Sequence, residues 1–293
     1  HTSSVGNQYT SVFDDASDFV NAISVTEIAW TVDVIPDAIA SIKIEDDDNG
    51  QGNEVTTATL SADESLILYA VAYDQYNNYI RDINAQWSVQ GSIGTVSTGT
   101  DFSTSTDFIA TTVGNGTVQA DTSSFTDGTG VITVTGGALS YLLIRDGSNG
   151  GGAEVGAVTL TTDESLILYA AGYDADDNYI SAVDASWQVT GDLDAVPASG
   201  ESIEFTPSTA PTTGTITVSS AGLTGAVTGT VTVNVGVLDN VLVEDAAGGL
   251  GSAVDAVEIT TDNTLTFYLV GYDQDNNYIR DINAQWSVQG SIG

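Results

Sequence analysis

Short apolar runs alternate with polar residues along most of the chain, and this alternation is the main structural signal in the sequence. In residues 85–89, Ala85, Trp87 and Val89 are separated by Gln and Ser, so they share one face of an extended segment. Similar runs recur between turn residues roughly every 8–12 positions, without a long helical pattern. The pattern predicts an all-β fold of short strands, with the Trp in the core of a β-sandwich.

The strand pattern belongs to a long internal repeat. Residues 73–94 return as residues 272–293 with one change, Tyr76 to Asp275, and a diverged copy occupies residues 173–191. Successive copies are 100 and then 99 positions apart, which is the length of a whole domain. We therefore expect an N-terminal segment at 1–36, complete units at 37–136 and 137–236, and an incomplete unit at 237–293.

Glycine, asparagine and proline mark the expected turns. A hairpin in each unit has Asn77, Asp177 or Asn276 at a position that needs left-handed backbone. Asn115-Gly116 is expected as a turn between strands at 108–112 and 117–120. The second unit has prolines between its expected strands, where they remove no ladder hydrogen bond: Pro197, Pro207 and Pro211.

The N-terminal segment does not follow the repeat from its start. Phe13–Ile23 has apolar residues at helical spacing behind two aspartates, which predicts a short helix. A period-two strand pattern follows and resembles the last strands of the full units, so we expect it to end a preceding unit or to act as a donor strand. Its apolar residues are Ile28, Trp30, Val32 and Val34.

Two motifs carry a resemblance to a known family. Leu68-x-Ala70-x-Ala72-x-Asp74-x-x-x-Asn78 is followed by Ala85-x-Trp87-x-Val89, and later by the run at 110–120. Residues 37–293 thereby resemble the bacterial immunoglobulin-like (Big) domains found in tandem in intimin- and invasin-type adhesins, although Asn or Asp replaces the Gly usual in the family's Asp-x-x-Gly-Asn hairpin. The resemblance implies a rod of stacked immunoglobulin-like sandwiches at the cell surface, with binding often located elsewhere in the protein.

Charge narrows the classes of partner. Four Lys and Arg stand against 40 Asp and Glu, for a formal net charge of -36. We expect neither nucleic acid nor an anionic membrane surface as a partner, because both need basic patches. There is no Cys, and no apolar run approaches the 18 residues of a membrane span, so we expect no membrane insertion. The composition is typical of an extracellular or cell-surface protein.

Catalysis finds little support in the sequence. His1 is the only histidine, and neither a Gly-x-Ser-x-Gly elbow nor a phosphate-binding loop occurs. Carboxylates are so numerous that their proximity alone has no meaning. We therefore expect a protein that is not an enzyme and has no certain cofactor.

Calcium is the main chemical option, because Ca²⁺ binds carboxylate and carbonyl oxygens without His or Cys. An acidic run follows the first strand of the first unit, and an oxygen-rich hairpin follows later. The candidate ligands are Asp46, Asp47, Asp48, Asp74 and Asn78. The alternative is a set of solvated acidic turns, because the acidic run shrinks in the other units and no EF-hand loop is present.

Aromatic residues form a recurring row on the strand face opposite Leu68, Ala70 and Ala72. Such a row predicts either lateral packing between copies or cover by a loop of the same unit. The residues are Tyr69, Tyr73, Tyr169, Tyr173, Tyr268 and Tyr272. Asn115-Gly116-Thr117 also matches a glycosylation sequon, although Asn-Gly is first of all a turn sequence.

The ends of the sequence suggest two kinds of continuation. Residues 237–293 and 1–36 together come close to one repeat, so either the array is longer or another copy completes the last unit by strand donation. We expect a structural subunit of an extracellular filament, sheath or adhesin stalk, whose partners are copies of itself or further repeats. The alternative is an adhesive module for glycan or protein, with or without calcium.

Overall fold

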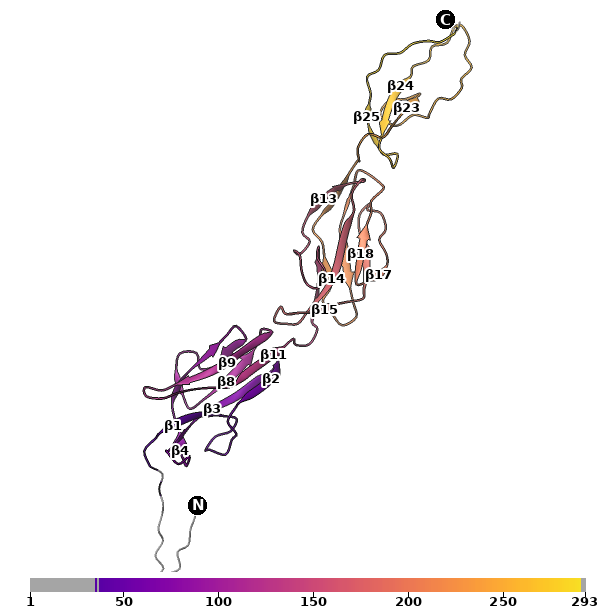
Figure 1. Cartoon of the computed structure of the whole chain (residues 1–293). Helices are drawn as coiled ribbons and strands as arrows, with labels where there is room; N and C mark the ends of the chain where they lie inside the picture. The colour runs from indigo at the N-terminus through magenta and orange to yellow at the C-terminus, as the bar shows by residue number, and fades with distance from the viewer. Residues whose placement is uncertain (1–34, 36, 291–293) are drawn as a thin grey trace, which may run out of the picture.

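The computed structural model describes residue 35 and residues 37–290, which form strands and loops in three consecutive units (Figure 1). Within these residues no helix occurs, and hence none that is long and apolar enough to cross a membrane. The helix expected at Phe13–Ile23 and the strand expected at 28–34 lie outside the described residues. The expected all-β fold is confirmed.

The first unit is a sandwich of two facing sheets. Its strands are β1 (Ser41–Glu45), β2 (Thr57–Ser61), β3 (Ser65–Tyr73), β4 (Tyr79–Asp82), β5 (Ala85–Gln90), β6 (Gly94–Val96), β7 (Phe102–Ser103), β8 (Ser105–Ala110), β9 (Gly114–Asp121), β10 (Thr126–Gly128) and β11 (Val131–Thr135). One sheet has the order β1-β3-β8-β6, with β4 beside β3. The other has the order β2-β11-β9-β5-β7, with β10 beside β9, and β2 runs parallel to β11.

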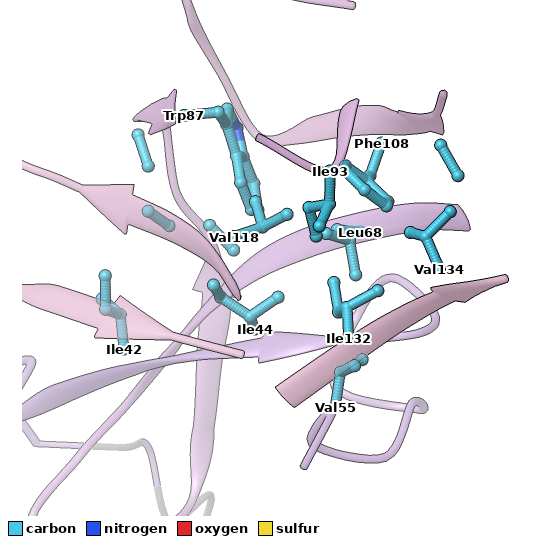
Figure 2. Packing of buried hydrophobic residues seen from close by; sticks show 14 of the residues in the cluster. Ile42, Ile44, Val55, Leu68, Trp87, Ile93, Phe108, Val118, Ile132 and Val134 are labelled. Atoms are coloured by element: carbon cyan, nitrogen blue, oxygen red, sulfur yellow. The ribbon is translucent and has the colours of Figure 1, made fainter. Parts of the chain in front are cut away.

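The core of the first unit forms between the two sheets. Ile44 and Leu68 from one sheet and Trp87 and Ile132 from the other are buried together (Figure 2). The Trp87 indole Nε1 donates a hydrogen bond to the Ser103 carbonyl at 3.1 Å, so its polar atom is satisfied. The expected core position of the Trp is confirmed.

The second unit repeats this arrangement with its second sheet in two pieces. Its strands are β12 (Tyr141–Arg145), β13 (Val158–Thr161), β14 (Leu166–Tyr173), β15 (Tyr179–Ala182), β16 (Ala185–Val189), β17 (Ser199–Gly200), β18 (Ser202–Phe205), β19 (Thr212–Gly214), β20 (Ile216–Ser219), β21 (Ala226–Val227) and β22 (Val231–Asn234). β14 is flanked by β12, β15 and β18, while β13-β22-β19 and β17-β16-β20-β21 form the opposite layer. Trp187 is buried in this unit's own core. The prolines lie between strands, as expected.

The third unit has one three-stranded sheet in the described part of the chain. Its strands are β23 (Asn240–Glu244), β24 (Tyr268–Tyr272) and β25 (Tyr278–Asp281), in that order. Residues 283–290, which contain Trp286, pair with no described strand. Trp286 is therefore 56% exposed, whereas Trp87 is 2% exposed.

One expected turn is wrong and three are confirmed. Asn77, Asp177 and Asn276 have φ values of 62°, 67° and 65°, which is the left-handed region. Asn115-Gly116 instead lies inside β9, which pairs with β11 through residues 114–116 and with β5 through residues 117–121. A Cβ on Gly116 would lie 2.4 Å from the Gln90 carbonyl, so this glycine permits close strand packing and does not form a turn.

The burial of the tryptophans gives a stability prediction. Trp87→Ala and Trp187→Ala should each destabilise their own unit by about 3–5 kcal/mol, because a buried aromatic side chain leaves a cavity. Trp286→Ala is the matched control and should change the stability of the third unit much less. Thermal unfolding followed by circular dichroism measures all three, and equal losses would contradict the assignment of the cores.

Candidate functional site

A polar hairpin with the pattern Asp-x-x-x-Asn closes one end of each unit. It occupies residues 74–78, 174–178 and 273–277. In the second unit, Asp174 Oδ1 accepts the N–H groups of Asp176 and Asn178 at 3.0 and 2.8 Å, and Oδ2 accepts the Asn178 side-chain amide at 2.9 Å. The buried carboxylate thus replaces water for the hairpin's amide groups and orients the asparagine.

The oriented asparagine binds the preceding unit. Asn178 Nδ2 donates to the Thr111 carbonyl at 2.9 Å, and its Oδ1 accepts the Val113 N–H at 3.0 Å. Both partner groups belong to the main chain of the loop between β8 and β9. One side chain therefore joins two units with a donor and an acceptor at once.

The linker between the units is held from both sides. Asp174 Oδ2 accepts the Gly137 N–H at 2.9 Å, and Asp63 Oδ2, from the preceding unit, accepts the Ala138 N–H at 2.7 Å. A Cβ on Gly137 would lie 2.4 Å from the Asp63 carboxylate. Glycine at this position therefore allows the close approach on which the junction depends.

The junction between the second and third units repeats these contacts. Asn277 donates to the Ser208 carbonyl and accepts the Ala210 N–H, both at 3.0 Å. Asp273 and Asp163 hold the Gly236 and Val237 N–H groups at 3.0 and 2.7 Å, and Thr162 Oγ1 adds a bond to Asp273 at 2.8 Å. Two junctions with the same geometry define the candidate functional site of the chain.

These hydrogen bonds control the acidity of the hairpin aspartates. Burial alone would raise the pKa of Asp273, but hydrogen bonds from Gly236, Asn277 and Thr162 outweigh it and lower the pKa to about 2. Burial also acts to raise the pKa of Asp174, but hydrogen bonds from Gly137 and Asn178 outweigh it, so the pKa lies below its ordinary value. Both junctions therefore depend on ionised carboxylates.

The first unit has the same hairpin, but in the described part of the chain the Asn78 side chain hydrogen-bonds only to Asp74. The Asn78 side-chain amide, helped by the Asn78, Asp37 and Tyr76 N–H groups, lowers the pKa of Asp74 to about 2. The side chain of Asn78 is exposed, and Tyr76 beside it is 74% exposed. Asp37 occupies the position that Gly137 and Gly236 have in the later linkers, and its own Oδ1 accepts the Ala38 N–H at 2.8 Å.

The calcium candidates divide between two separate sites. Asp74 and Asn78 belong to the hairpin, where hydrogen bonds occupy both Asp74 oxygens. Asp46, Asp47 and Asp48 are exposed in the loop after β1, where Asp46 Oδ1 accepts the Asn53 N–H at 2.6 Å. Among the described residues no group of three or more His, Cys, Asp or Glu is placed to hold a metal. Calcium at these five residues stays a prediction.

The tyrosine row is partly covered within each unit. Tyr73, Tyr173 and Tyr272 are buried, and Tyr73 meets Tyr79 edge to face with ring centroids 6.4 Å apart. The contact that the sequence predicts for these three between copies stays a prediction. Tyr69, Tyr169 and Tyr268 are half-buried, and their role between copies stays a prediction.

The remaining candidates are a strand and a sequon. Ile28, Trp30, Val32 and Val34 lie outside the described residues. Asn115 is exposed on β9, and its Oδ1 accepts the Thr133 hydroxyl at 2.8 Å. Its glycosylation stays a prediction.

Sequence reasoning did not identify the junction residues Asp63, Asp163, Asn178 and Asn277. Each partner pair is separated by more than 60 positions in the chain. The available signal was that Asp and Asn keep their hairpin positions in all three units while the residues between them vary.

Comparisons with known proteins found similarity only among solved structures, since no family model and no curated protein matches. The adhesin FdeC of Escherichia coli is 16% identical, with 83% of this chain and 77% of that chain covered and a TM-score of 0.38. Domains 4–9 of the surface layer protein SbsC are 18% identical, with 83% and 38% covered and a TM-score of 0.28. A C-terminal intimin fragment, solved in complex with an intimin-binding domain, is 17% identical, with 71% and 66% covered and a TM-score of 0.24. The fold class of the chain follows from its own strands and cores.

The junction contacts predict which amides are protected from exchange. Asn178→Ala should raise hydrogen exchange at Val113 roughly 30-fold, because it removes two hydrogen bonds worth about 1 kcal/mol each. Gly137→Ala should act in the same direction by pushing Asp63 away, whereas Gly156→Ala, where a Cβ meets nothing within 4 Å, is the control. Protection at Val113 that survives both changes would argue against this junction.

The aspartate pKa values predict an acid-sensitive junction. A pKa that is about 2 when folded and about 4 when unfolded gives stability that is present above pH 4 and lost as the pH falls toward 2. The protection of the Gly236 N–H should fall over that window. Asp273→Asn should weaken this protection at neutral pH and flatten its pH dependence, and exchange measured by NMR tests both.

Proposed function

We propose that this chain is a non-catalytic structural component of an extracellular filament, sheath or adhesin stalk, in which immunoglobulin-like units are joined head to tail. The repeated Asp-Asn junction supports this function best. Each junction fixes the linker from both units and adds a bidentate contact between the hairpin and the preceding loop. Such junctions resist bending between units, as a stalk requires.

The charge of the chain supports a role at the surface. A formal net charge of -36 keeps separate rods apart at low ionic strength. The same charge opposes close lateral contact until salt or divalent cations screen it. Assembly end to end places fewer charges in contact than assembly side by side.

The third unit supports assembly by strand completion. Leu265, Phe267, Trp286 and Val288 line an open groove of about 640 Å³. In the first unit the equivalent face is filled, because β9 pairs beside Trp87 and β11 packs Ile132 and Val134 into the core. The groove therefore fits apolar strands of another immunoglobulin-like unit, either from further repeats or from the segment 28–34 of a second copy.

The experiment compares the full chain at 0.05 and 1 M NaCl by electron microscopy and analytical ultracentrifugation. At high salt the Debye length falls to about 3 Å, so repulsion between copies is screened and regular fibres should form. The Trp286 emission should shift to the blue as its groove fills, and the shift should disappear in Trp286→Phe. Trp30→Asp should prevent fibres if segment 28–34 is the donor.

A monomer with unchanged Trp286 emission at every salt concentration would contradict strand completion between copies. Dispersed rods that bind a glycan or a protein would favour the adhesive alternative.

A further inference from the structure

The last residue of the first strand differs between units in a way that suggests a cation site. This position is Glu45 in β1, Arg145 in β12 and Glu244 in β23. Its backbone environment is the same in all three, because each residue forms an isolated antiparallel bridge to the residue nine positions later. The charge at one structural position thus changes sign between equivalent units.

In the second unit a side-chain cation binds the following loop. Arg145 Nε donates to the Gly151 carbonyl at 3.1 Å, and Nη2 donates to the Gly152 carbonyl at 2.7 Å. The guanidinium carbon lies 5.9 Å from the centre of the Tyr173 ring. Two carbonyl oxygens and an aromatic face therefore surround a positive charge.

In the first and third units a buried carboxylate replaces this cation. Glu45 and Glu244 are 3% and 2% exposed. Glu45 Oε1 accepts the Tyr73 hydroxyl at 2.5 Å, and Glu244 Oε1 accepts the Tyr272 hydroxyl. The Oε2 atoms of both glutamates are buried and have no partner among the described residues. A buried, unpartnered carboxylate oxygen is costly and needs a counter-charge or a proton.

The loops that follow share two hydrogen bonds in the three units. Asp46, Asp146 and Asp245 donate their N–H groups to the residue seven positions later at 3.1, 3.1 and 3.2 Å. Their Oδ1 atoms accept the N–H of that same residue at 2.6, 2.6 and 2.7 Å. By position in the loop, residues 51–52 and 250–251 correspond to the two residues whose carbonyls Arg145 binds, although Gly152 has a φ of 69° and neither Gly52 nor Gly251 lies in the left-handed region. In the described part of the chain the carbonyls of residues 51–52 and 250–251 accept no hydrogen bond.

We propose that a calcium ion occupies the place of the Arg145 guanidinium in the first and third units. Its ligands are Glu45 Oε2 with the carbonyls of residues 51–52 in one unit, and Glu244 Oε2 with the carbonyls of residues 250–251 in the other, completed by water. Ca²⁺ accepts such mixed carboxylate and carbonyl sets, whereas Mg²⁺ keeps most of its water. With one carboxylate in each site, the affinity belongs to the range of about 10⁻⁴–10⁻³ M of extracellular modules.

The surroundings make the two sites unequal. Lys43 lies 5.3 Å from the centre of the Tyr73 ring and pairs with Glu54 at 3.4 Å, so a positive charge already stands near Glu45. The position of Lys43 is Leu242 in the third unit, and that of Glu54 is Ala253. The site at Glu244 should therefore bind Ca²⁺ more tightly than the site at Glu45.

Because equivalent units have Glu or Arg at this position, the proposal can be tested by substituting one residue for the other. Calcium binding to the full chain is measured by equilibrium dialysis at 0.5 M NaCl, which suppresses diffuse binding to the acidic surface. The native chain should bind two ions. Glu45→Arg and Glu244→Arg should each remove one, and Arg145→Glu should add a third. Asp101→Asn, which changes an exposed carboxylate outside the three loops, should leave the number at two.

Thermal unfolding at neutral pH separates a calcium site from a protonated carboxyl. Calcium should raise the melting temperature of the native chain, and Glu45→Gln with Glu244→Gln should abolish that rise, with folding checked by circular dichroism. The proposal would be overturned if the number of bound calcium ions were the same in the native chain and in the Glu45→Arg, Glu244→Arg and Arg145→Glu variants. It would also be overturned if calcium left the melting temperature of the native chain unchanged.

Discussion

The hairpin aspartate is the interaction on which the rest of the structure depends. Its carboxylate satisfies amide groups of the hairpin, orients the neighbouring asparagine and, in Asp174 and Asp273, also holds the linker that enters the unit. Because one buried charge serves all three tasks, the end of each sandwich and the junction are a single hydrogen-bonded network. The hairpin and the linker that enters each unit are therefore held by the same carboxylate.

The local features of the fold could be predicted from the sequence, and the long-range ones could not. Trp87 and the left-handed Asn77 followed from alternation and turn chemistry within a few residues. Asn115-Gly116 was misread because the contact that requires glycine comes from the Gln90 carbonyl on a neighbouring strand. The junction was missed because Asn178 binds main-chain groups, and these groups are present whatever side chains the loop has.

Acidic residues have two different roles in this chain. Exposed carboxylates such as Asp47 and Asp48 contribute to solubility. Buried carboxylates are structural: Asp174 and Asp273 are surrounded by N–H donors that favour the ionised form, whereas Glu45 and Glu244 have only a tyrosine hydroxyl. The number of hydrogen-bond donors around each carboxylate determines how well its burial is compensated.

The asparagine at each junction contacts only the main chain of the preceding loop, and this has an evolutionary consequence. Thr111 and Val113 at one junction correspond to Ser208 and Ala210 at the other, yet the hydrogen bonds are the same. Mutations in that loop can therefore accumulate without disturbing the stacking of neighbours. A gene that gains or loses a repeat by duplication or deletion would retain a working connection at once, so the length of such an array can change faster than its sequence.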